Sequence, residues 1–485
     1  MASEPFVVVG ADAAGLSAAS KCRRADPDRE VIVFEKGAWI SYAYCGMPYF
    51  IAGRIDQLSN LLSLSPAQAA DRGIDLRRNH EVVAVDPDAQ TVRVEHDGDS
   101  FDQPYGDLLI ATGGRAVTGS LDVRDLDGAF TLHSMDAAAA IDACIAEPAD
   151  YDFDRIADTP ADRALVEANA ALDVPETAAI VGGGYVGIEM AEALVGRGLD
   201  VHLFHRSEHL LPAFGESVAD RVEAELRDQG VSVHTNTPVE ALVGGDRIEG
   251  VVYDDPGGST ADDGTVELGV DLAVVGIGIV PNTELLAGTD VDYGDGGALV
   301  TDEFGRTTLA NVYAAGDCAT DRHVVTGEHV WMPLGLTANR AGRAIGAIVG
   351  GDPTPVGDIA ATAVVKAFDL ECGRVGLLAE DDATAAGFDP VTTTITAGSR
   401  SGYYPGTSET DVTLVADRET GRLLGGAIVG ADRAAVRINT LATALDAEMG
   451  VFDLEQLDLA YAPPFSPVWD PILVAAKVLN GKLSG

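Results

Sequence analysis

The chain has 485 residues, of which 77 are acidic and 32 basic, so its formal net charge is −45. A surface this negative repels nucleic acids and anionic membranes, which excludes both as expected partners. We interpret the carboxylate excess as an adaptation to a salt-loaded, halophilic cytoplasm, where dissolved ions screen the repulsion between the charges; an acidic but otherwise ordinary enzyme is the alternative. No apolar run has transmembrane length and no leader precedes Phe6, so a cytoplasmic protein of about three domains is expected.

The N-terminal segment predicts a dinucleotide-binding unit. A buried strand from Phe6 leads into a glycine turn over Gly10–Gly15, a helix comes next over 16–24, and a second strand ends at Glu35. In this arrangement the glycines let the backbone approach a pyrophosphate, the helix N-terminus receives its charge, and the acid binds ribose hydroxyls. Asp12 replaces the middle glycine of the fingerprint, but the flanking strands and the terminal acid support the prediction.

A single cysteine comes after this unit. Cys45 lies in the stretch Ser41-Tyr42-Ala43-Tyr44-Cys45-Gly46-Met47-Pro48-Tyr49, where the ring of a bound flavin would lie. The other cysteines are scattered and form no CxxC pattern, so neither a disulfide framework nor a metal site is predicted: Cys22, Cys144, Cys318 and Cys372. A redox thiol without a partner in its own chain takes one from a small molecule, or it cycles through an oxidised single sulfur.

Three segments have connecting roles. An apolar strand and turn over 108–114 return the chain to the pyrophosphate. The stretch 147–175 is acidic and poor in aliphatic residues, so we interpret it as a solvated insertion or hinge without chemistry. The Gly/Asp-rich stretch 254–264 predicts a turn on a hairpin.

A second dinucleotide fingerprint begins after a strand over 179–181. It has all three glycines, Gly182, Gly184 and Gly187, and its second strand ends in His205 and Arg206 instead of an acid. A carboxylate there would repel a 2′-phosphate, whereas a guanidinium pairs with it. We therefore expect FAD at the first site and NADPH, in preference to NADH, at the second; a solvent-facing role for Arg206 remains the alternative.

The remainder of the chain predicts a return to the first unit and a further domain. An apolar strand over 311–315 ends in Gly316-Asp317, and this acid could hold a ribityl hydroxyl of the flavin. From about Pro355, alternating apolar residues predict strands over 362–368, 391–396, 411–416 and 423–429, and helices over 434–449 and 472–479. This segment has no nucleotide motif and is interpreted as a separate α+β domain.

The predicted fold class is thus α/β, with two Rossmann-like three-layer domains and a C-terminal α+β domain. The expected boundaries are 1–150 for the first part of the FAD domain, 151–275 for the NAD(P)H domain, 276–354 for the second part of the FAD domain, and 355–485 for the C-terminal domain. The candidate FAD residues are Gly10, Ala11, Ala14, Gly15, Glu35, Lys36, Thr112, Gly113 and Asp317. The candidate NADPH residues are Gly182, Gly184, Tyr185, Gly187, His205 and Arg206.

These pieces, in this order, resemble the FAD-dependent pyridine nucleotide–disulfide oxidoreductases over essentially the whole chain. The stretch SYAYCGMPYFIAG around Cys45, Gly276–Asn282 and Pro333–Arg343 resemble the single-cysteine branch, which holds coenzyme A disulfide reductases, NADH oxidases and NADH peroxidases. The resemblance implies a homodimer in which the C-terminal dimerisation domain of one subunit completes the active site of the other.

Within that branch, the chain resembles the coenzyme A disulfide reductases more than the oxidases. The oxidases and peroxidases carry a histidine where this chain has Ala13, and Pro48-Tyr49 comes after the cysteine as in the reductases. Tyr403-Tyr404-Pro405-Gly406 and Ala460-Tyr461-Ala462-Pro463-Pro464 also match the reductases. By resemblance, Tyr461 and one of Tyr403 and Tyr404, with Tyr403 favoured, reach Cys45 of the other subunit; interface packing is the alternative role.

The charge distribution favours coenzyme A as the diffusible thiol. In a chain with only five lysines, Lys21, Arg23 and Arg24 cluster at the end of the first helix, and a 3′-phosphate and a diphosphate require such cations. The contacts implied by the resemblance are Ser17, Lys21, Arg24, Ser41, Tyr44 and Asn339. The chain departs from the family pattern at two positions. Tyr44 replaces the polar residue that usually precedes the cysteine, and the position near Trp469 corresponds to the place where a basic residue is expected shortly after Pro464.

The expected reaction passes a hydride from NADPH through FAD to a mixed disulfide between Cys45 and coenzyme A, and so reduces coenzyme A disulfide or a related small disulfide or persulfide. A helix beginning at Pro48 and the adjacent flavin are expected to lower the pKa of Cys45, and Tyr461 would protonate the leaving sulfur. The alternatives are an NAD(P)H oxidase that uses a Cys45 sulfenic acid, and a slow flavin redox sensor or electron carrier.

Overall fold

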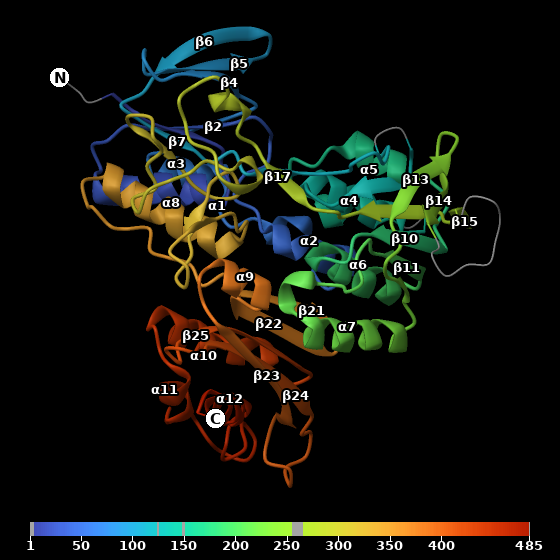
Figure 1. The fold of residues 1–485 in the computed structure, drawn as a ribbon. Coiled ribbons are helices and arrows are strands. Elements are labelled where there is room, and N and C mark those ends of the chain that lie inside the picture. The colour runs from blue at the N-terminus through green and yellow to red at the C-terminus, as the bar shows by residue number, and fades with distance from the viewer. Residues whose placement is uncertain (1–3, 124–125, 148–150, 255–264, 485) are drawn as a thin grey trace.

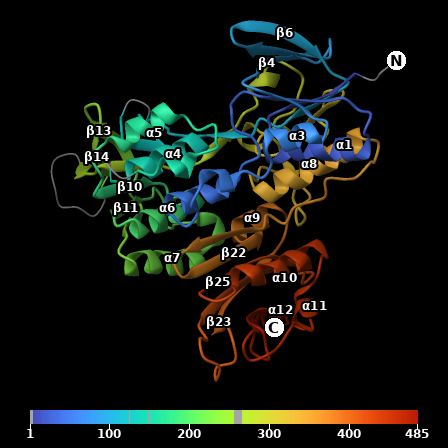
Figure 2. The same cartoon turned by 180° about the vertical axis from the view of Figure 1, so that it is seen from behind.

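The computed structural model describes residues 4–123, 126–147, 151–254 and 265–484, and the chain forms three lobes (Figure 1). Two nucleotide-type lobes lie side by side, and the C-terminal lobe lies below them; the view from behind gives the same arrangement (Figure 2). The predicted fold class, with two Rossmann-type lobes and an additional C-terminal domain, is confirmed.

The first lobe is built on a parallel sheet with strand order β18-β7-β1-β2-β3. Apolar side chains of β1 alternate between two layers, with α1, α3 and α8 on one face and an antiparallel β4-β5-β6 sheet on the other. The elements are β1 (Phe6–Val9), α1 (Ala13–Ala25), β2 (Val31–Glu35), α3 (Pro66–Asp71), β3 (Asp75–Arg78), β4 (Glu81–Asp86), β5 (Thr91–His96), β6 (Asp99–Pro104), β7 (Asp107–Ile110), β18 (Val312–Ala314) and α8 (Gly335–Val349).

Two helices from opposite ends of this lobe's sequence pack in direct contact. Gly342 and Gly346 of α8 face α1, where an added Cβ would lie 2.1 Å from the carbonyl oxygens of Ala14 and Ala18. Only glycine allows so close an approach. Because α1 begins at the first fingerprint, this contact places α8 beside the nucleotide turn.

The second lobe repeats the design, with a parallel sheet in the order β12-β11-β10-β16-β9 and an antiparallel β13-β14-β15 sheet on one face. Its elements are β9 (Ala129–Thr131), α4 (Met135–Cys144), α5 (Arg163–Ala170), β10 (Thr177–Val181), α6 (Tyr185–Gly196), β11 (Asp200–Phe204), α7 (Glu216–Asp228), β12 (Ser232–His234), β13 (Val239–Gly244), β14 (Ile248–Asp254), β15 (Thr265–Gly269) and β16 (Leu272–Val275). The expected turn at 254–264 joins β14 to β15, but 255–264 lie outside the described residues.

Two predictions about this lobe are wrong. Strand β9 pairs with β16, so the chain enters the second sheet by Ala129, and the boundary expected at 150 is too late. The described part of the acidic stretch, 151–175, is not a solvated insertion: Ile156 and Val166 are buried in the main core, and α5 packs on α4. A few apolar anchors at helical spacing suffice for this packing, although the overall composition of the stretch is acidic.

The C-terminal domain has an antiparallel sheet in the order β21-β22-β25-β24-β23, covered by helices. Its elements are β21 (Ala363–Ala367), β22 (Leu370–Gly376), α9 (Glu380–Ala385), β23 (Pro390–Gly398), β24 (Glu409–Asp417), β25 (Leu423–Gly430), α10 (Ala434–Asp446), α11 (Val451–Glu455) and α12 (Pro471–Leu483). Strand β22 was not predicted, because its sequence LECGRVG has neither a continuous apolar run nor regular alternation.

Short elements connect the lobes. They are α2 (Met47–Ile51), the paired strands β8 (Gly114–Ala116) and β17 (Ile279–Pro281), and the paired strands β19 (Asp321–Arg322) and β20 (His329–Val330). The 3-10 turns are η1 (Tyr44–Gly46), η2 (Leu58–Leu61), η3 (Phe153–Ile156), η4 (Pro212–Phe214), η5 (Glu284–Leu286) and η6 (Asp295–Gly297).

One buried carboxylate joins all three lobes. Glu192 of α6 accepts hydrogen bonds from Arg54 of the first lobe at 2.9 Å and from Lys366 of the C-terminal domain at 2.7 Å. Its other oxygen accepts the backbone N–H of Phe368 at 3.0 Å. The relative positions of the lobes are therefore fixed in part by this single side chain.

Candidate active site

A cavity of about 1350 Å³ runs along the carboxyl ends of the strands in the first lobe. It is lined by most of the predicted FAD residues, namely Gly10, Ala11, Ala14, Glu35, Lys36, Thr112, Gly113 and Asp317, and by Cys45. Gly15 lies behind the lining, where an added Cβ would meet the carbonyl oxygen of Gly10 at 1.9 Å. Gly15 therefore allows the helix to pack closely on the strand.

The glycine turn of the first lobe fits a dinucleotide. Gly10 has φ +106, and an added Cβ would lie 2.1 Å from the carbonyl oxygen of Ala111. Glu35 accepts the N–H of Ala11 at 3.0 Å and the N–H of Gly37 at 2.8 Å, which fixes the end of β2 against the turn. No side chain caps the start of α1, so its first N–H groups stay available for a diphosphate.

Cys45 lies in the turn η1 and is exposed to this cavity, whereas the other four cysteines are buried and free. The pKa of its thiol is raised, first by desolvation and then by the negative charge of Glu189. The expected lowering by a helix that begins at Pro48 is therefore wrong for the protein alone. Helix α2 has only five residues, and its dipole is outweighed by desolvation and by a carboxylate contributed from the second lobe.

Glu189 is a candidate that the sequence analysis missed. It lies on α6, and the hydroxyl of Tyr49 donates to its carboxylate at 3.3 Å. Burial raises the pKa of Glu189 to about 7, and Glu192 one turn later adds to the effect. The available signal was that Glu189 and Glu192 are the only charged residues on an otherwise apolar helix.

A pair of tyrosines borders Cys45. The hydroxyl of Tyr42 donates to the hydroxyl of Tyr44 at 2.6 Å, and the ring of Tyr44 lies 5.4 Å from the ring of His133. All three line the cavity, as does Ser41, whose backbone has φ +47. The polar side chain expected next to Cys45 is thus replaced by an aromatic ring held in place by its neighbour.

The second fingerprint repeats the geometry of the first. Gly182 has φ +117, an added Cβ on Gly187 would lie 1.8 Å from the carbonyl oxygen of Gly182, and Gly184 faces open space. Tyr185 begins α6, with its ring 5.5 Å from that of Phe214. His205 Nδ1 accepts the N–H of Gly183 at 3.1 Å.

Two nitrogen-containing side chains, His205 and Arg206, come directly after β11. The Nε2 atom of His205 is buried without a hydrogen-bond partner among the described residues. Burial and the nearby Arg206 lower the pKa of His205, so its ring is neutral at pH 7. Arg206 is exposed and makes no ion pair within the described part of the chain.

The predicted coenzyme A contacts are brought together only in part. Ser17 donates to Asn339 at 2.7 Å across the contact between α1 and α8, and Arg24 lines the same cavity. Arg72 and Arg343 also line it and were not predicted. Lys21 does not line the cavity, because its ammonium lies 3.7 Å from the carboxylate of Asp352.

A buried ion cluster holds the helix that comes directly after Cys45. Asp142 is 1 % exposed and pairs with Arg155 at 2.7 Å and with Arg197 at 3.5 Å. The same guanidinium groups donate to the carbonyl oxygens of Phe50 and Ile51 at the end of α2. Arg155 lies in the stretch interpreted as solvated, so that stretch contributes to the support of the Cys45 segment.

The tyrosines of the C-terminal domain lie outside this cavity. The hydroxyls of Tyr403 and Tyr461 are 3.5 Å apart, and both side chains are exposed. Tyr404 is also exposed, and its N–H donates to the carbonyl oxygen of Ser401. Within one chain, therefore, none of these tyrosines meets Cys45.

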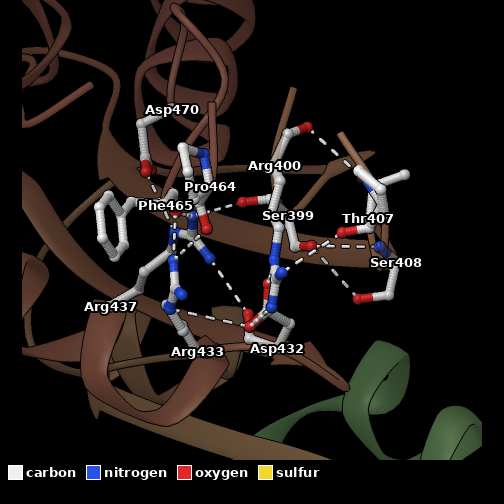
Figure 3. A network of polar contacts seen from close by, with 11 residues as sticks. Ser399, Arg400, Thr407, Ser408, Asp432, Arg433, Arg437, Pro464, Phe465 and Asp470 are labelled. Carbon is white, nitrogen blue, oxygen red and sulfur yellow. Dashed lines mark hydrogen bonds and ion pairs between the residues drawn. The ribbon is translucent and has the colours of Figure 1, made fainter. Parts of the chain in front are cut away.

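A polar network holds the two loops that carry these tyrosines (Figure 3). The buried Arg437 donates to Asp470 at 3.0 Å and to the carbonyl oxygen of Ser399 at 2.8 Å. Arg433 donates to the carbonyl oxygen of Phe465 at 2.8 Å. Arg400 forms a bidentate pair with Asp432 at 2.6 and 2.9 Å, seen near the centre of the view. The two loops are thereby fixed to one framework.

The described residues contain neither a membrane-spanning helix nor a metal-binding cluster. None of their helices is both long and apolar enough to span a bilayer. No group of three or more histidine, cysteine or acidic side chains in the same ranges is arranged to hold a metal ion.

Two family models match the chain. The model described as pyridine nucleotide-disulphide oxidoreductase matches residues 4–342, and the model of the corresponding dimerisation domain matches residues 362–471. A relative named NAD(P)H sulfur oxidoreductase (CoA-dependent), from Pyrococcus abyssi, is 38% identical over 98% of both chains. A relative named coenzyme A disulfide reductase, from Staphylococcus haemolyticus, is 29% identical over 95% of this chain and 96% of its own.

The fold is also similar to a solved structure. An NAD-dependent persulfide reductase from A. fulgidus superposes with a TM-score of 0.88 at 32% identity, covering 99% of this chain and 84% of that protein. The similarity thus extends over all three lobes.

Proposed function

The chain belongs to the pyridine nucleotide-disulphide oxidoreductase family, and from this premise we propose that it reduces coenzyme A disulfide, or a related small disulfide or persulfide, at Cys45 with electrons from NADPH. The balanced reaction converts NADPH, one proton and one disulfide into NADP⁺ and two thiols. The family is flavin-dependent, and FAD and NAD(P)H are its cofactors. When bound, FAD supplies two-electron transfer between the nicotinamide and a disulfide.

One observation carries the proposal: of the five free cysteines, only Cys45 opens onto the cavity. No second cysteine of the chain is there to form a disulfide with it. The electrons that reach Cys45 must therefore be stored with a diffusible sulfur compound or on the sulfur itself.

The proposed cycle uses Cys45 as the nucleophile. Reduction of a mixed disulfide between Cys45 and coenzyme A releases one thiol and leaves Cys45 as a thiolate. This thiolate attacks one sulfur of the next disulfide, the S–S bond breaks, and the second thiol leaves while the mixed disulfide forms again. The leaving sulfur takes a proton, for which Tyr461 is the proposed donor.

A second subunit is required by this proposal, because Tyr461 and Tyr403 are remote from Cys45 of their own chain. The C-terminal domain exposes large apolar side chains close to these loops, including Phe465, Val468 and Trp469. Exposed apolar groups of this size are typical of a surface that another protein covers. We take the occupant to be a second copy of the chain, in keeping with the matched dimerisation domain.

Coenzyme A is supported as the thiol by the cationic wall near α1. Arg24, Arg72 and Arg343 line the cavity, and none of them has an ion-pair partner among the residues described. Guanidinium groups that no carboxylate neutralises suit the phosphates of coenzyme A. Ser17 and Asn339 line the same cavity and are proposed polar contacts.

A persulfide or polysulfide is the second candidate substrate. It is favoured by the names of the Pyrococcus abyssi relative and of the A. fulgidus structure, which refer to sulfur and persulfide. The same residues would serve, because a persulfide also contains an S–S bond that a thiolate can attack.

The deciding experiment monitors NADPH consumption in molar KCl without oxygen, with coenzyme A disulfide as acceptor. In parallel reactions the acceptor is coenzyme A persulfide, oxygen or hydrogen peroxide. The proposal requires fast turnover with one of the two sulfur acceptors and release of free coenzyme A thiol. Turnover with oxygen alone would replace it by an oxidase, and no turnover with any acceptor would favour a redox sensor.

A further inference from the structure

Asp12 stands where the fingerprint of the first lobe normally has its middle glycine, directly beside the turn that receives the diphosphate of FAD. Its backbone is extended, with φ −112, so this position does not require glycine. The equivalent residue of the second lobe is Gly184, where an added Cβ would meet nothing within 4 Å. The turn therefore has room for a side chain, and in the first lobe a carboxyl group fills it.

The carboxyl group of Asp12 faces the cavity and has one fixed contact. One of its oxygens accepts the N–H of Tyr42 at 2.9 Å, in the same segment that carries Cys45. Asp12 makes no side-chain cap to its own helix. It therefore ties the nucleotide turn to the Cys45 segment from a position on the wall of the space that the cofactor would occupy.

Several elements contribute charged residues to the cavity around the Asp12 carboxyl group. Glu35 at the end of β2 and Asp317 after β18 are carboxylates in the same cavity. Tyr42, Tyr44 and His133 border it, and His133 lies near Asp317. The other charged residues that line the cavity are Arg24, Lys36, Arg72, Glu81, Arg115, Glu284 and Arg343. Glu35 and Asp317 are the carboxylates whose charges act on Asp12, and Asp12 is the acidic group inside the nucleotide turn.

We propose that Asp12 takes up one proton from solvent when FAD binds, and that the resulting O–H donates to the cofactor's diphosphate while the other oxygen keeps the N–H of Tyr42. Without the proton, two like charges would share a site from which water is excluded, which is unfavourable. In support, burial raises the pKa of Asp12 to about 7. The charges of Glu35 and Asp317 raise this pKa further, whereas hydrogen bonds from the N–H groups of Tyr42 and Ala13 lower it. The inference rests on the family's FAD site and not on the proposed substrate.

Proton uptake makes the affinity for FAD depend on pH with a defined sign. Below the pKa of the free protein, Asp12 is already protonated, so the dissociation constant is constant. Above it, each bound FAD requires a proton from solvent, and the dissociation constant rises by up to about tenfold per pH unit.

The test measures flavin released from the holoenzyme. The protein is diluted in molar KCl at pH 6 to 9, free flavin is separated by ultrafiltration, and its fluorescence gives the dissociation constant. Wild type is expected to be constant below pH 6.5 and to lose affinity by about tenfold between pH 8 and 9. Asp12→Asn retains an oxygen for Tyr42 and a donor for the diphosphate, so its affinity should not depend on pH. Asp12→Ala has neither the charge nor the donor, so its affinity should be independent of pH and lower than that of Asp12→Asn.

The control is Asp28→Asn, an exposed acid in the same lobe, which should keep the wild-type profile. A wild-type dissociation constant that does not change between pH 6 and 9 would overturn the inference, even if Asp12→Asn does not fold. A pH dependence that persists unchanged in Asp12→Asn would also overturn it. In either outcome FAD still binds, so the proposed function is left to its own experiment.

Discussion

The N–H of Gly183 donates to Nδ1 of His205 at 3.1 Å, in the place where the N–H of Ala11 donates to Glu35 at 3.0 Å in the other lobe. The two nucleotide turns thus use the same backbone contact with different chemistry at its end. A carboxylate there accepts hydrogen bonds from ribose hydroxyls, whereas a neutral imidazole next to an arginine has no charge that repels a phosphate.

This difference predicts a preference for NADPH that depends on Arg206. Substitution Arg206→Ala removes a charge-assisted hydrogen bond that contributes about 1.5–3 kcal/mol to binding. The value of kcat/KM for NADPH should therefore fall by about ten- to a hundredfold. The value for NADH should hardly change. Steady-state kinetics with both nucleotides check this, with Arg206→Lys as a variant that keeps the charge. A wild-type enzyme that prefers NADH tenfold would contradict the assignment.

A second prediction concerns the thiol itself. Cys45→Ser should abolish disulfide reduction, because a hydroxyl does not form the thiolate that attacks a disulfide. The flavin should stay bound, and NADPH should still bleach it, because the second lobe is unchanged. Absorbance spectra before and after NADPH measure bleaching, and thiol release measures turnover. Substantial turnover in the variant would remove Cys45 from the mechanism.

A third prediction tests whether two subunits share one site. Tyr461→Phe should lower kcat for the disulfide by about a hundredfold, as expected for a lost proton donor. If Tyr461 of one subunit serves Cys45 of the other, a heterodimer of Cys45→Ser and Tyr461→Phe subunits contains one intact site. Random reassembly of equal amounts makes half of the dimers mixed, so about a quarter of wild-type activity should return.

The measurement compares the mixture before and after the subunits are unfolded and refolded together. Tyr403→Phe and Tyr404→Phe, each paired with Cys45→Ser in the same way, identify which tyrosine of the loop takes part. Activity that stays near zero after reassembly, with mixed dimers verified by mass, would place any role of Tyr461 within its own chain.

The parts of the molecule that could be predicted from sequence are those encoded by short local patterns. Both glycine turns, the strands before them and the acid at the end of β2 are local features, and they place the cavity at Gly10 and Cys45. The packing of Arg155 could not be predicted, because its partner Asp142 is buried in a different helix and the surrounding composition is polar. The rise in the pKa of Cys45 was also missed, because it comes first from desolvation in the folded site and then from Glu189, which reaches the thiol from another lobe.

That long-range contact gives a fourth prediction, on the reactivity of Cys45. Glu189 has a pKa of about 7 and, when ionised, raises the pKa of the thiol. Glu189→Gln removes this charge, so at pH 8 a larger fraction of Cys45 is thiolate, and alkylation by iodoacetamide should be about two- to tenfold faster. At pH 6 Glu189 is largely protonated in the wild type, and the difference should shrink.

The alkylation rate is measured by mass spectrometry from pH 6 to 9. Glu240→Gln, an exposed acid on β13 of the same lobe, serves as the control and should match the wild type. Equal rates for Glu189→Gln and wild type at pH 8 would show that Glu189 does not control the thiol.

The fifth prediction concerns salt. With a formal net charge of −45, the folded chain is destabilised by repulsion between carboxylates that folding brings closer together. The Debye length is about 3 Å at 1 M salt and about 30 Å at 0.01 M, so this repulsion is screened only in concentrated salt. Dialysis from 2 M to 0.01 M KCl should therefore unfold the protein, as measured by far-UV circular dichroism and by flavin release. Sucrose at equal osmolality separates the two effects of salt, because it is excluded from the protein surface but screens no charge, and it should not restore the fold. Full helical signal and activity in dilute buffer would contradict a requirement for salt.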